Sequence, residues 1–261
     1  MENKKGEKVV SLFNSIAPRY DLVNFITSWG NDGRWRKKGV ELFLEELKKR
    51  EGLRWKNWEK GERIGRIEGV EPPLSPFRVV DVATGTGKMV KTLCQIGKKR
   101  GIKLEILGVD PSPQMLEIAQ KECPFATFQL GKGEQLPFPD NFADGVTIAF
   151  GLRNFENFPQ GVEEIYRILK PGGLLLVLEF VAGKGIFRKV VDWYTSTLVP
   201  LIGGLLTGNR EAYSYLSSSI SYFYTPDQLL SLFSSSNFTP LHTLTFNAGQ
   251  LLVAVLKKKV I

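Results

Sequence analysis

Between residues 77 and 180, short apolar runs alternate regularly with stretches of helical spacing, and this alternation constrains the fold most. The apolar runs lie at residues 77–83, 104–110, 126–130, 143–149 and 173–180. Apolar residues at helical spacing separate them, at residues 88–99, 113–121 and 161–169. The last run, Gly173 to Phe180, is almost continuously apolar, which suits a strand covered on both faces. The alternation predicts an α/β fold with a parallel sheet.

The flanking segments predict two closing strands and added helices. Residues 238–245 and 250–256 are expected to pair as strands after a helix at 226–235. A helical appendage interrupted near Pro18 and an exposed connector from Trp55 to Pro76 precede the sheet, so a domain over residues 1–75 is expected before one over 76–261. The aromatic residues 184–225 are expected to form a helical insertion after the fifth strand. The fold class is therefore a Rossmann-like, seven-stranded, mostly parallel sheet with helices on both faces.

Composition favours a cytoplasmic protein with its own core. The chain has 261 residues, of which 43% are hydrophobic, with 17 Phe and 5 Trp, and this suffices for one elaborated domain. Cys94 and Cys123 lack the spacing of a disulfide scaffold or a zinc site, so we expect both to be reduced and no metal to be bound. The charged amino terminus shows no apolar signal segment, which indicates a cytoplasmic location.

The chain is basic, with a net charge of +8 and a pI of 9.4. Its lysines and arginines are not interleaved with aromatic residues, so nucleic acid is not an expected partner. The uncharged run at 193–209 is too short for a spanning helix and contains Pro200 and Gly203. We expect this insertion and the N-terminal helices to touch an anionic membrane surface at the inner face of the membrane, the alternatives being packing on the core or a homodimer contact.

The first strand runs directly into a glycine turn that resembles a cofactor site. Asp81 lies inside the strand, and Gly85 and Gly87 open the helix that follows. A nicotinamide dinucleotide site requires a third glycine where this chain has Val90. S-adenosylmethionine carries no phosphate, and its ammonium group suits an acid or carbonyl oxygens. Asp110, at the end of the second strand, can accept both ribose hydroxyls, although a tight turn with a helix-capping acid explains the same pattern.

Several longer stretches carry a more specific pattern. They are Ala17-Pro-Arg-Tyr-Asp-Leu-Val-Asn24, Ser28-Trp-Gly-Asn-Asp-Gly-Arg-Trp35, Leu136-Pro-Phe-Pro-Asp140, Ala149-Phe-Gly-Leu-Arg-Asn154, Arg167-Ile-Leu-Lys-Pro-Gly-Gly173, Leu178-Glu-Phe180 and Ala212-Tyr-Ser-Tyr-Leu216. Through them the chain resembles the class I S-adenosylmethionine-dependent methyltransferases, and within these the ubiquinone/menaquinone biosynthesis C-methyltransferases. The resemblance implies methylation of a ring carbon of a prenylated quinol, with demethylmenaquinol as the leading candidate.

The resemblance, carried over by position, also implies roles for particular residues. The cofactor-binding residues are Asp81, Gly85, Thr86, Gly87, Asp110, Lys132, Gly133 and Ala149. Tyr20, Asn24 and Trp35 would form a lid over the site. Arg153 and Asn154 would be catalytic and face the quinol: a protonated arginine can stabilise a phenolate and orient the water that takes its proton.

Some residues depart from the family pattern and leave alternatives open. Lys132 stands where an acceptor for the adenine amine is usual, and Lys88 replaces a usual acid. The alternatives are a methyltransferase of another small aromatic acceptor and a cofactor-binding protein without catalysis. Asp21 and Asp32 are rival proton acceptors, the single histidine, His242, is expected to be structural, and Arg153 has the alternative of a surface salt bridge to Glu156.

Overall fold

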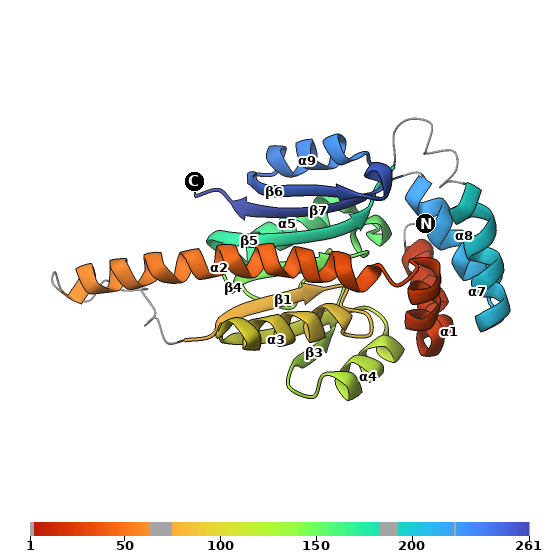
Figure 1. The fold of residues 1–261 in the computed structure, drawn as a ribbon, viewed down its shortest axis with the longest axis horizontal. Coiled ribbons are helices and arrows are strands. Elements are labelled where there is room, and N and C mark those ends of the chain that lie inside the picture. The colour runs from red at the N-terminus through yellow and green to blue at the C-terminus, as the bar shows by residue number, and fades with distance from the viewer. Residues whose placement is uncertain (1–2, 63–74, 183–192, 222, 261) are drawn as a thin grey trace.

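The computed structural model describes residues 3–62, 75–182, 193–221 and 223–260, and it contains a seven-stranded sheet in the order β3-β2-β1-β4-β5-β7-β6 (Figure 1). The strands are β1 (Phe77–Val82), β2 (Leu104–Asp110), β3 (Thr127–Leu130), β4 (Ala143–Ala149), β5 (Leu169–Phe180), β6 (Phe238–Phe246) and β7 (Leu251–Lys258). Strands β1 to β5 are mutually parallel, and β7 runs antiparallel to both β5 and β6. The predicted fold class is confirmed.

Helices cover both faces of this sheet. The α-helices of the described residues are α1 (Asn3–Thr27), α2 (Asp32–Glu62), α3 (Lys88–Arg100), α4 (Pro113–Glu122), α5 (Phe158–Ile168), α7 (Val199–Thr207), α8 (Arg210–Ser221) and α9 (Pro226–Ser235). Alternate residues of each strand point to opposite faces. Val79 and Leu176 therefore pack under α2 and α3, whereas Val80 and Leu175 pack under α5 and α9. Two apolar cores on one sheet explain why β5 is apolar almost throughout.

Two expectations for the N-terminal region are wrong. Helix α1 continues through Pro18 instead of breaking there. A proline removes one helical hydrogen bond, but Ile16 and Val23 on either side are buried against Tyr213 of α8, and this packing holds the helix together. Helix α2 extends to Glu62, so the first part of the expected connector is helical. Residues 63–74 of the connector and 183–192 of the insertion lie outside the described residues.

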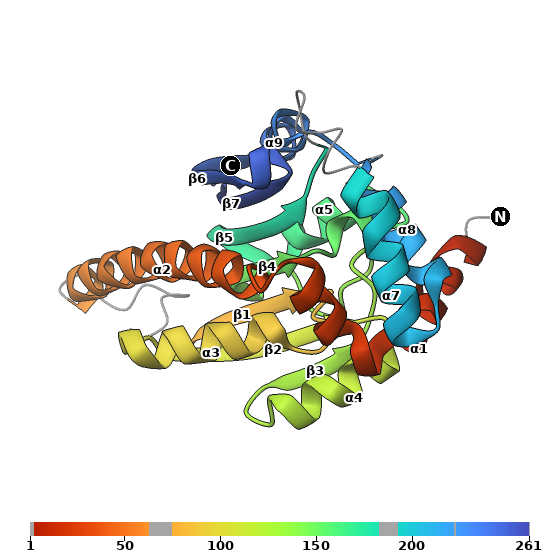
Figure 2. The same cartoon turned by 45° about the vertical axis from the view of Figure 1, so that its right-hand side comes forward.

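Helices α1, α7 and α8 gather beyond the carboxyl ends of the parallel strands, as both views show (Figures 1 and 2). Helix α1 packs on α7, α8 and α4, so the N-terminal appendage and the insertion form one roof over that edge of the sheet. Ligands of open α/β sheets bind at this edge. Within the described ranges, none of the helices combines the length and apolarity needed to cross a membrane.

Candidate functional site

A cavity of about 600 Å³ lies between the carboxyl ends of the strands and the roof helices. Its polar end is formed at the carboxyl ends of β1 and β2, by residues that include Asp81, Gly85 and Asp110. Its apolar end is lined by side chains from α7 and α8, namely Val199, Tyr213, Leu216 and Ile220, and the apolar side chains of Val9, Val10 and Phe13 of α1 also line the cavity. The cavity thus joins a site for a polar ligand to a site for an apolar one.

The two glycines of the turn after β1 have different roles. Gly85 has a φ of 55°, lines the cavity, and a Cβ added there would meet nothing within 4 Å. Space therefore exists for a ligand against its backbone. Gly87 has a φ of 81° and is not part of the lining: its added Cβ would lie 3.3 Å from the Ala119 Cβ and 3.4 Å from the Cys123 Sγ. Gly87 therefore lets α3 pack closely on α4. It was expected among the cofactor-binding residues, but it does not line the cavity.

Two buried carboxylates lie at the polar end. Asp110 is 7% exposed and accepts hydrogen bonds from the Gly85 amide at 2.8 Å and the Ser112 amide at 2.9 Å. Burial raises its pKa to about 6, against the effect of these two bonds. Burial likewise raises the pKa of Asp81 to about 6, although its oxygens accept hydrogen bonds from Thr147 and Thr84, each at 2.6 Å. Both carboxyls are therefore mainly ionised at neutral pH.

Helix α1 is connected to the glycine turn by its acid Asp21. The Thr86 hydroxyl donates to Asp21 Oδ1 at 2.9 Å, and Lys88 Nζ lies 3.4 Å from Asp21 Oδ2. The expected lid residues Tyr20, Asn24 and Trp35 all line the cavity. Trp35 is contributed by α2 and packs edge-on against the ring of Phe180 at 6.1 Å. Burial raises the pKa of Tyr20, with the charge of Arg153 acting against it, so the Tyr20 hydroxyl is protonated at neutral pH.

The three residues expected on the adenine side also line the cavity. Lys132 Nζ pairs with Glu156 Oε1 at 3.0 Å, so the ammonium group is held by an acid of the loop that precedes α5. A Cβ on Gly133 would lie 2.4 Å from the ring of Phe155, so close packing requires glycine there. Ala149 ends β4 and lines the cavity as well.

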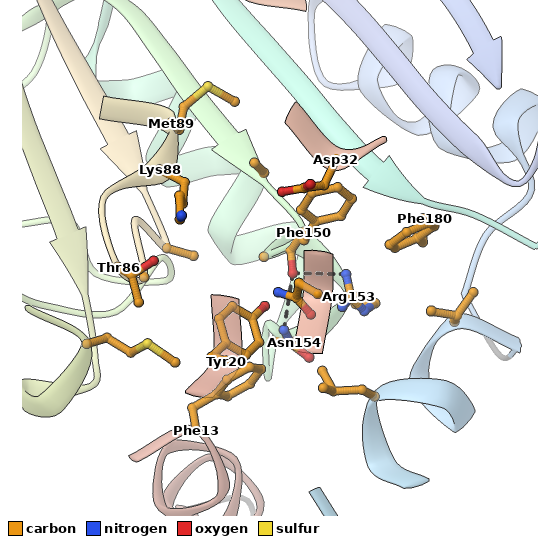
Figure 3. Close-up of a pocket in the computed structure, with 18 of the residues that line it drawn as sticks. Phe13, Tyr20, Asp32, Thr86, Lys88, Met89, Phe150, Arg153, Asn154 and Phe180 are labelled. Carbon is orange, nitrogen blue, oxygen red and sulfur yellow. Dashed lines mark hydrogen bonds between the residues drawn. The ribbon is translucent and has the colours of Figure 1, made fainter. Parts of the chain in front are cut away.

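Arg153 and Asn154 lie where the polar and apolar ends of the cavity meet, in the 3-10 helix η1 (Leu152–Asn154) after β4. Figure 3 shows both bonded to the Phe150 carbonyl, with Tyr20 and Phe180 on opposite sides of them. The Asn154 Oδ1 accepts from the Tyr215 hydroxyl at 3.4 Å.

The alternative of a surface salt bridge between Arg153 and Glu156 is wrong. The Arg153 side chain is 4% exposed and pairs with Glu179, whereas Glu156 pairs with Lys132. Glu179 has no expected role from the sequence, although it stands in the matched stretch that ends at Phe180. The carboxyl ends of β4 and β5 are adjacent, which indicates that Glu179 lies near the Arg153 segment but does not by itself give the pairing of the two side chains.

The remaining candidates have structural partners. Asp32 lines the cavity but accepts from Arg36 Nη2 at 3.1 Å, four residues further along α2. His242 lies outside the lining, and its Nε2 is 2.9 Å from Glu46 Oε1, which connects β6 to α2 as a structural contact.

Two solved structures illustrate the similarity of fold. A S-adenosylmethionine-dependent methyltransferase from Thermotoga maritima superimposes with a TM-score of 0.58 at 18% identity, covering 95% of this chain and 99% of that one. The [4+2]-cyclase SpnF superimposes with a TM-score of 0.52 at 19% identity, covering 72% of this chain and 76% of that one. Likeness at this level shows the fold, and the residues of the site have to decide the chemistry.

The acids at the ends of β1 and β2 suit the ammonium and ribose groups of S-adenosylmethionine, and the open space at Gly85 suits its amino-acid end. Fold and site together define a class I S-adenosylmethionine-dependent methyltransferase. The chain belongs to the ubiE/COQ5 methyltransferase family, whose model matches residues 1–256.

Curated relatives agree with this family. The demethylmenaquinone methyltransferase of Thermotoga maritima is 37% identical over 240 residues, covering 91% of each chain. The enzyme of the same name from Thermus thermophilus is 37% identical over 87% of this chain and 91% of its own. The ubiquinone/menaquinone biosynthesis C-methyltransferase of Geobacter sulfurreducens is 34% identical over 90% of this chain and 82% of its own.

Proposed function

We propose that this protein transfers the methyl group of S-adenosylmethionine to a ring carbon of demethylmenaquinol. One observation carries the proposal: a single cavity joins the acids of the cofactor end to an apolar end, with Arg153 and Asn154 where the two meet. A prenylated quinol has a polar ring and an apolar tail. The ring matches the polar side chains of Arg153 and Asn154, and the tail matches the apolar end of the cavity. Three relatives that are 37% identical carry the name demethylmenaquinone methyltransferase, which favours this acceptor over the ubiquinone precursor.

The polar end would hold the methyl donor by charge and hydrogen bonding. Asp110 would accept from the ribose hydroxyls, and Asp81 with the backbone of Gly85 and Thr86 would serve the amino-acid end. Lys132, Gly133 and Ala149 would form the wall around the adenine. When bound, the cofactor supplies a methyl group on a positively charged sulfur. The protein then has to hold the acceptor carbon in line with that methyl and exclude water.

Arg153 and Asn154 would prepare the quinol for attack. A quinol that loses a phenolic proton would carry negative charge on its oxygen and on the ring carbon that takes the methyl group. The carbon–sulfur bond would break as the carbon–carbon bond forms, and the ring carbon would then release its hydrogen as a proton, which restores the aromatic ring. Arg153 remains protonated, so it stabilises the phenolate instead of acting as a base. The Asn154 amide can orient the water that takes the proton. Tyr20 and Asn24 of α1 and Trp35 of α2 would close the site.

We also propose that the roof touches an anionic membrane surface at the inner face of the membrane. Trp29 is 81% exposed and Trp193 is 58% exposed, and the Tyr194 hydroxyl donates to the Thr27 carbonyl at 3.0 Å, which brings the two segments together. Leu205 of α7 is 79% exposed on the same roof. Thr27, Trp29 and Tyr194 all line the cavity, so an apolar tail has a short path from a bilayer into the site.

Labelled S-adenosylmethionine with short-chain demethylmenaquinol tests the proposed activity. Transfer of label to demethylmenaquinol supports the proposed activity. Preferential transfer to the demethylated ubiquinol precursor would show that this precursor, and not demethylmenaquinol, is the acceptor. Transfer to neither, with cofactor binding intact, would favour another small aromatic acceptor or a binding protein without catalysis.

A further inference from the structure

Glu179, at the end of β5, is a fully buried carboxylate beside the cavity. Its exposed fraction is 0%, its neighbours along the strand are Leu178 and Phe180, and it does not line the cavity. A buried charge is costly unless it is paired and hydrogen-bonded. Burial raises the pKa of Glu179, and the charge and hydrogen bonds of Arg153 act against that rise. A residue so placed acts on the cavity only through its partners.

Within the part of the chain that the structure describes, the hydrogen-bond and ion-pair partners of Glu179 belong to the segment that carries Arg153 or to its own strand. The carboxylate forms an ion pair with Arg153 Nη1. Its Oε2 accepts from the Arg153 amide at 3.4 Å, and its Oε1 accepts from the Phe180 amide at 2.8 Å. Glu179 therefore holds both the main chain and the side chain of Arg153.

The other contacts of Arg153 complete this arrangement. Its Nη1 also donates to the Phe150 carbonyl at 2.9 Å, and its Nε donates to the Ser219 hydroxyl of α8 at 3.2 Å. Among the described residues, Nη2 has no hydrogen-bond partner. Because guanidinium is planar, fixing Nε and Nη1 also fixes the direction of the Nη2 hydrogens.

We infer that Glu179 is a positioning residue that holds the Arg153 guanidinium by Nη1, so that Nη2 is the donor which Arg153 offers to an oxygen of the substrate. This inference rests on the proposed function, in which Arg153 stabilises the phenolate. The pair is neutral overall, so the wall between the two ends of the cavity accommodates an uncharged quinol and provides a directed donor as charge develops on it.

A double-mutant cycle tests whether Glu179 acts through Arg153. The variants are Glu179→Gln, Arg153→Ala and the double variant, measured with labelled S-adenosylmethionine and short-chain demethylmenaquinol. Glu179→Gln keeps the shape and a hydrogen-bond acceptor but removes the charge. We expect kcat to fall by about tenfold or more, while KM for the quinol and Kd for the cofactor change by less than about threefold. In the Arg153→Ala background, the same substitution should lower kcat no further.

Glu164→Gln is the matched control, because Glu164 pairs with Arg167 outside the cavity lining. The kcat of this variant should stay within about twofold of the wild-type value. Glu179→Asp keeps the charge and should recover part of the kcat lost in Glu179→Gln, which also covers the case in which the glutamine variant folds poorly. An equal loss of kcat with and without Arg153, or a loss of cofactor affinity that matches the loss of kcat, would overturn the inference while leaving the proposed function in place. A wild-type protein that methylates no quinol would overturn both.

Discussion

Asp21 of the roof helix accepts a hydrogen bond from the hydroxyl of Thr86, in the glycine turn, at 2.9 Å. The same carboxylate lies 3.4 Å from the ammonium of Lys88, the first residue of α3. These two contacts connect a helix from the start of the chain to the turn proposed to hold the cofactor. Lys88, which departs from the family pattern as a basic residue, therefore has a partner in the roof.

Asp21→Ala should loosen α1 over the turn. Losing a hydrogen bond and a partly exposed ion pair costs about 1 kcal/mol, so we expect the cofactor to dissociate about threefold to tenfold faster. Stopped-flow measurements give the dissociation rate, and amide hydrogen exchange reports the opening of residues 8–24. Lys91→Ala, which breaks an exposed pair between α3 and α4, is the control and should change neither. Unchanged exchange in α1 would contradict the connection.

Arg153→Ala should lower turnover much more than cofactor binding. Removing a donor to developing negative charge costs about a hundredfold or more in kcat, whereas the cofactor Kd should stay within about threefold. Isothermal titration calorimetry and label transfer provide the two numbers. Arg78→Ala, at an arginine paired with Glu105 outside the cavity lining, should leave both unchanged. If cofactor binding and turnover fall to the same degree, Arg153 has a different role.

Cofactor affinity should depend on pH through Asp81 and Asp110. Burial raises the pKa of each to about 6, and the ionised form is the one that accepts from hydroxyls and attracts an ammonium group. Lowering the pH from 7 to 5 should therefore weaken binding by about tenfold for each carboxylate that contacts the cofactor. Calorimetry across this range measures the effect, and Asp110→Asn should flatten part of it. An affinity independent of pH would show that neither carboxylate binds the cofactor.

The same two pKa shifts set the pH dependence of the unliganded fold. Because both folded-state values lie above the usual 3.8, these groups stabilise the fold fully only below about pH 4. This contribution is lost as the pH rises through about 6. The cofactor should thus raise the unfolding temperature more at pH 7 than at pH 5, and thermal unfolding with and without S-adenosylmethionine checks the difference.

Trp29→Ser combined with Trp193→Ser should weaken association with vesicles that contain anionic lipid. Arg34 and Lys37, near the start of α2, are exposed, so flotation of the wild type should decrease as salt rises, and the double variant should float about tenfold less. Phe125→Ser, at an exposed aromatic residue between α4 and β3 that does not line the cavity, is the control. A doubled mass in light scattering without flotation would instead favour a homodimer formed by the exposed roof.

Lys258→Met should lower the free energy of unfolding. The Lys258 ammonium is buried and donates to the Leu169 carbonyl at 2.7 Å, the Tyr166 carbonyl at 2.8 Å and the Asn141 side chain at 3.3 Å. Burial lowers its pKa, yet removing it leaves buried carbonyls without their donor, at a cost of about 1–3 kcal/mol. Urea unfolding measures this, with the exposed Lys257→Met as control. Activity per folded molecule should not change.

The sheet was predictable because its two covered faces leave a strong pattern in the sequence. A strand with Val79 on one core and Val80 on the other has to be apolar on both sides. The length of α2 was not predictable in this way. Its last part runs past the sheet in Figure 1, where no apolar face is required, and the periodicity fades there. The break expected near Pro18 was wrong because local helix propensity does not take into account the burial of Ile16 and Val23, which stabilises the helix on both sides of the proline.

The residues of the site also fall into those that the sequence could predict and those that it could not. Asp81, Gly85 and Asp110 stand at strand ends, and the topology alone brings strand ends together at one edge. The pairing of Arg153 with Glu179 needs the register of β4 on β5, and a sequence pattern does not supply that register. Gly87 shows the opposite case, because a glycine that matches a cofactor motif serves helix packing.

Because α1 lies over both ends of one cavity, the donor and acceptor sites have a common cover. Asn14 and Asp21 fasten it on the donor side, and Thr27 fastens it near the other end through Tyr194. Under the proposed function, an outward movement of this helix on the donor side would therefore also disturb the acceptor side. Release of the used methyl donor and entry of the next quinol would then depend on the same helix.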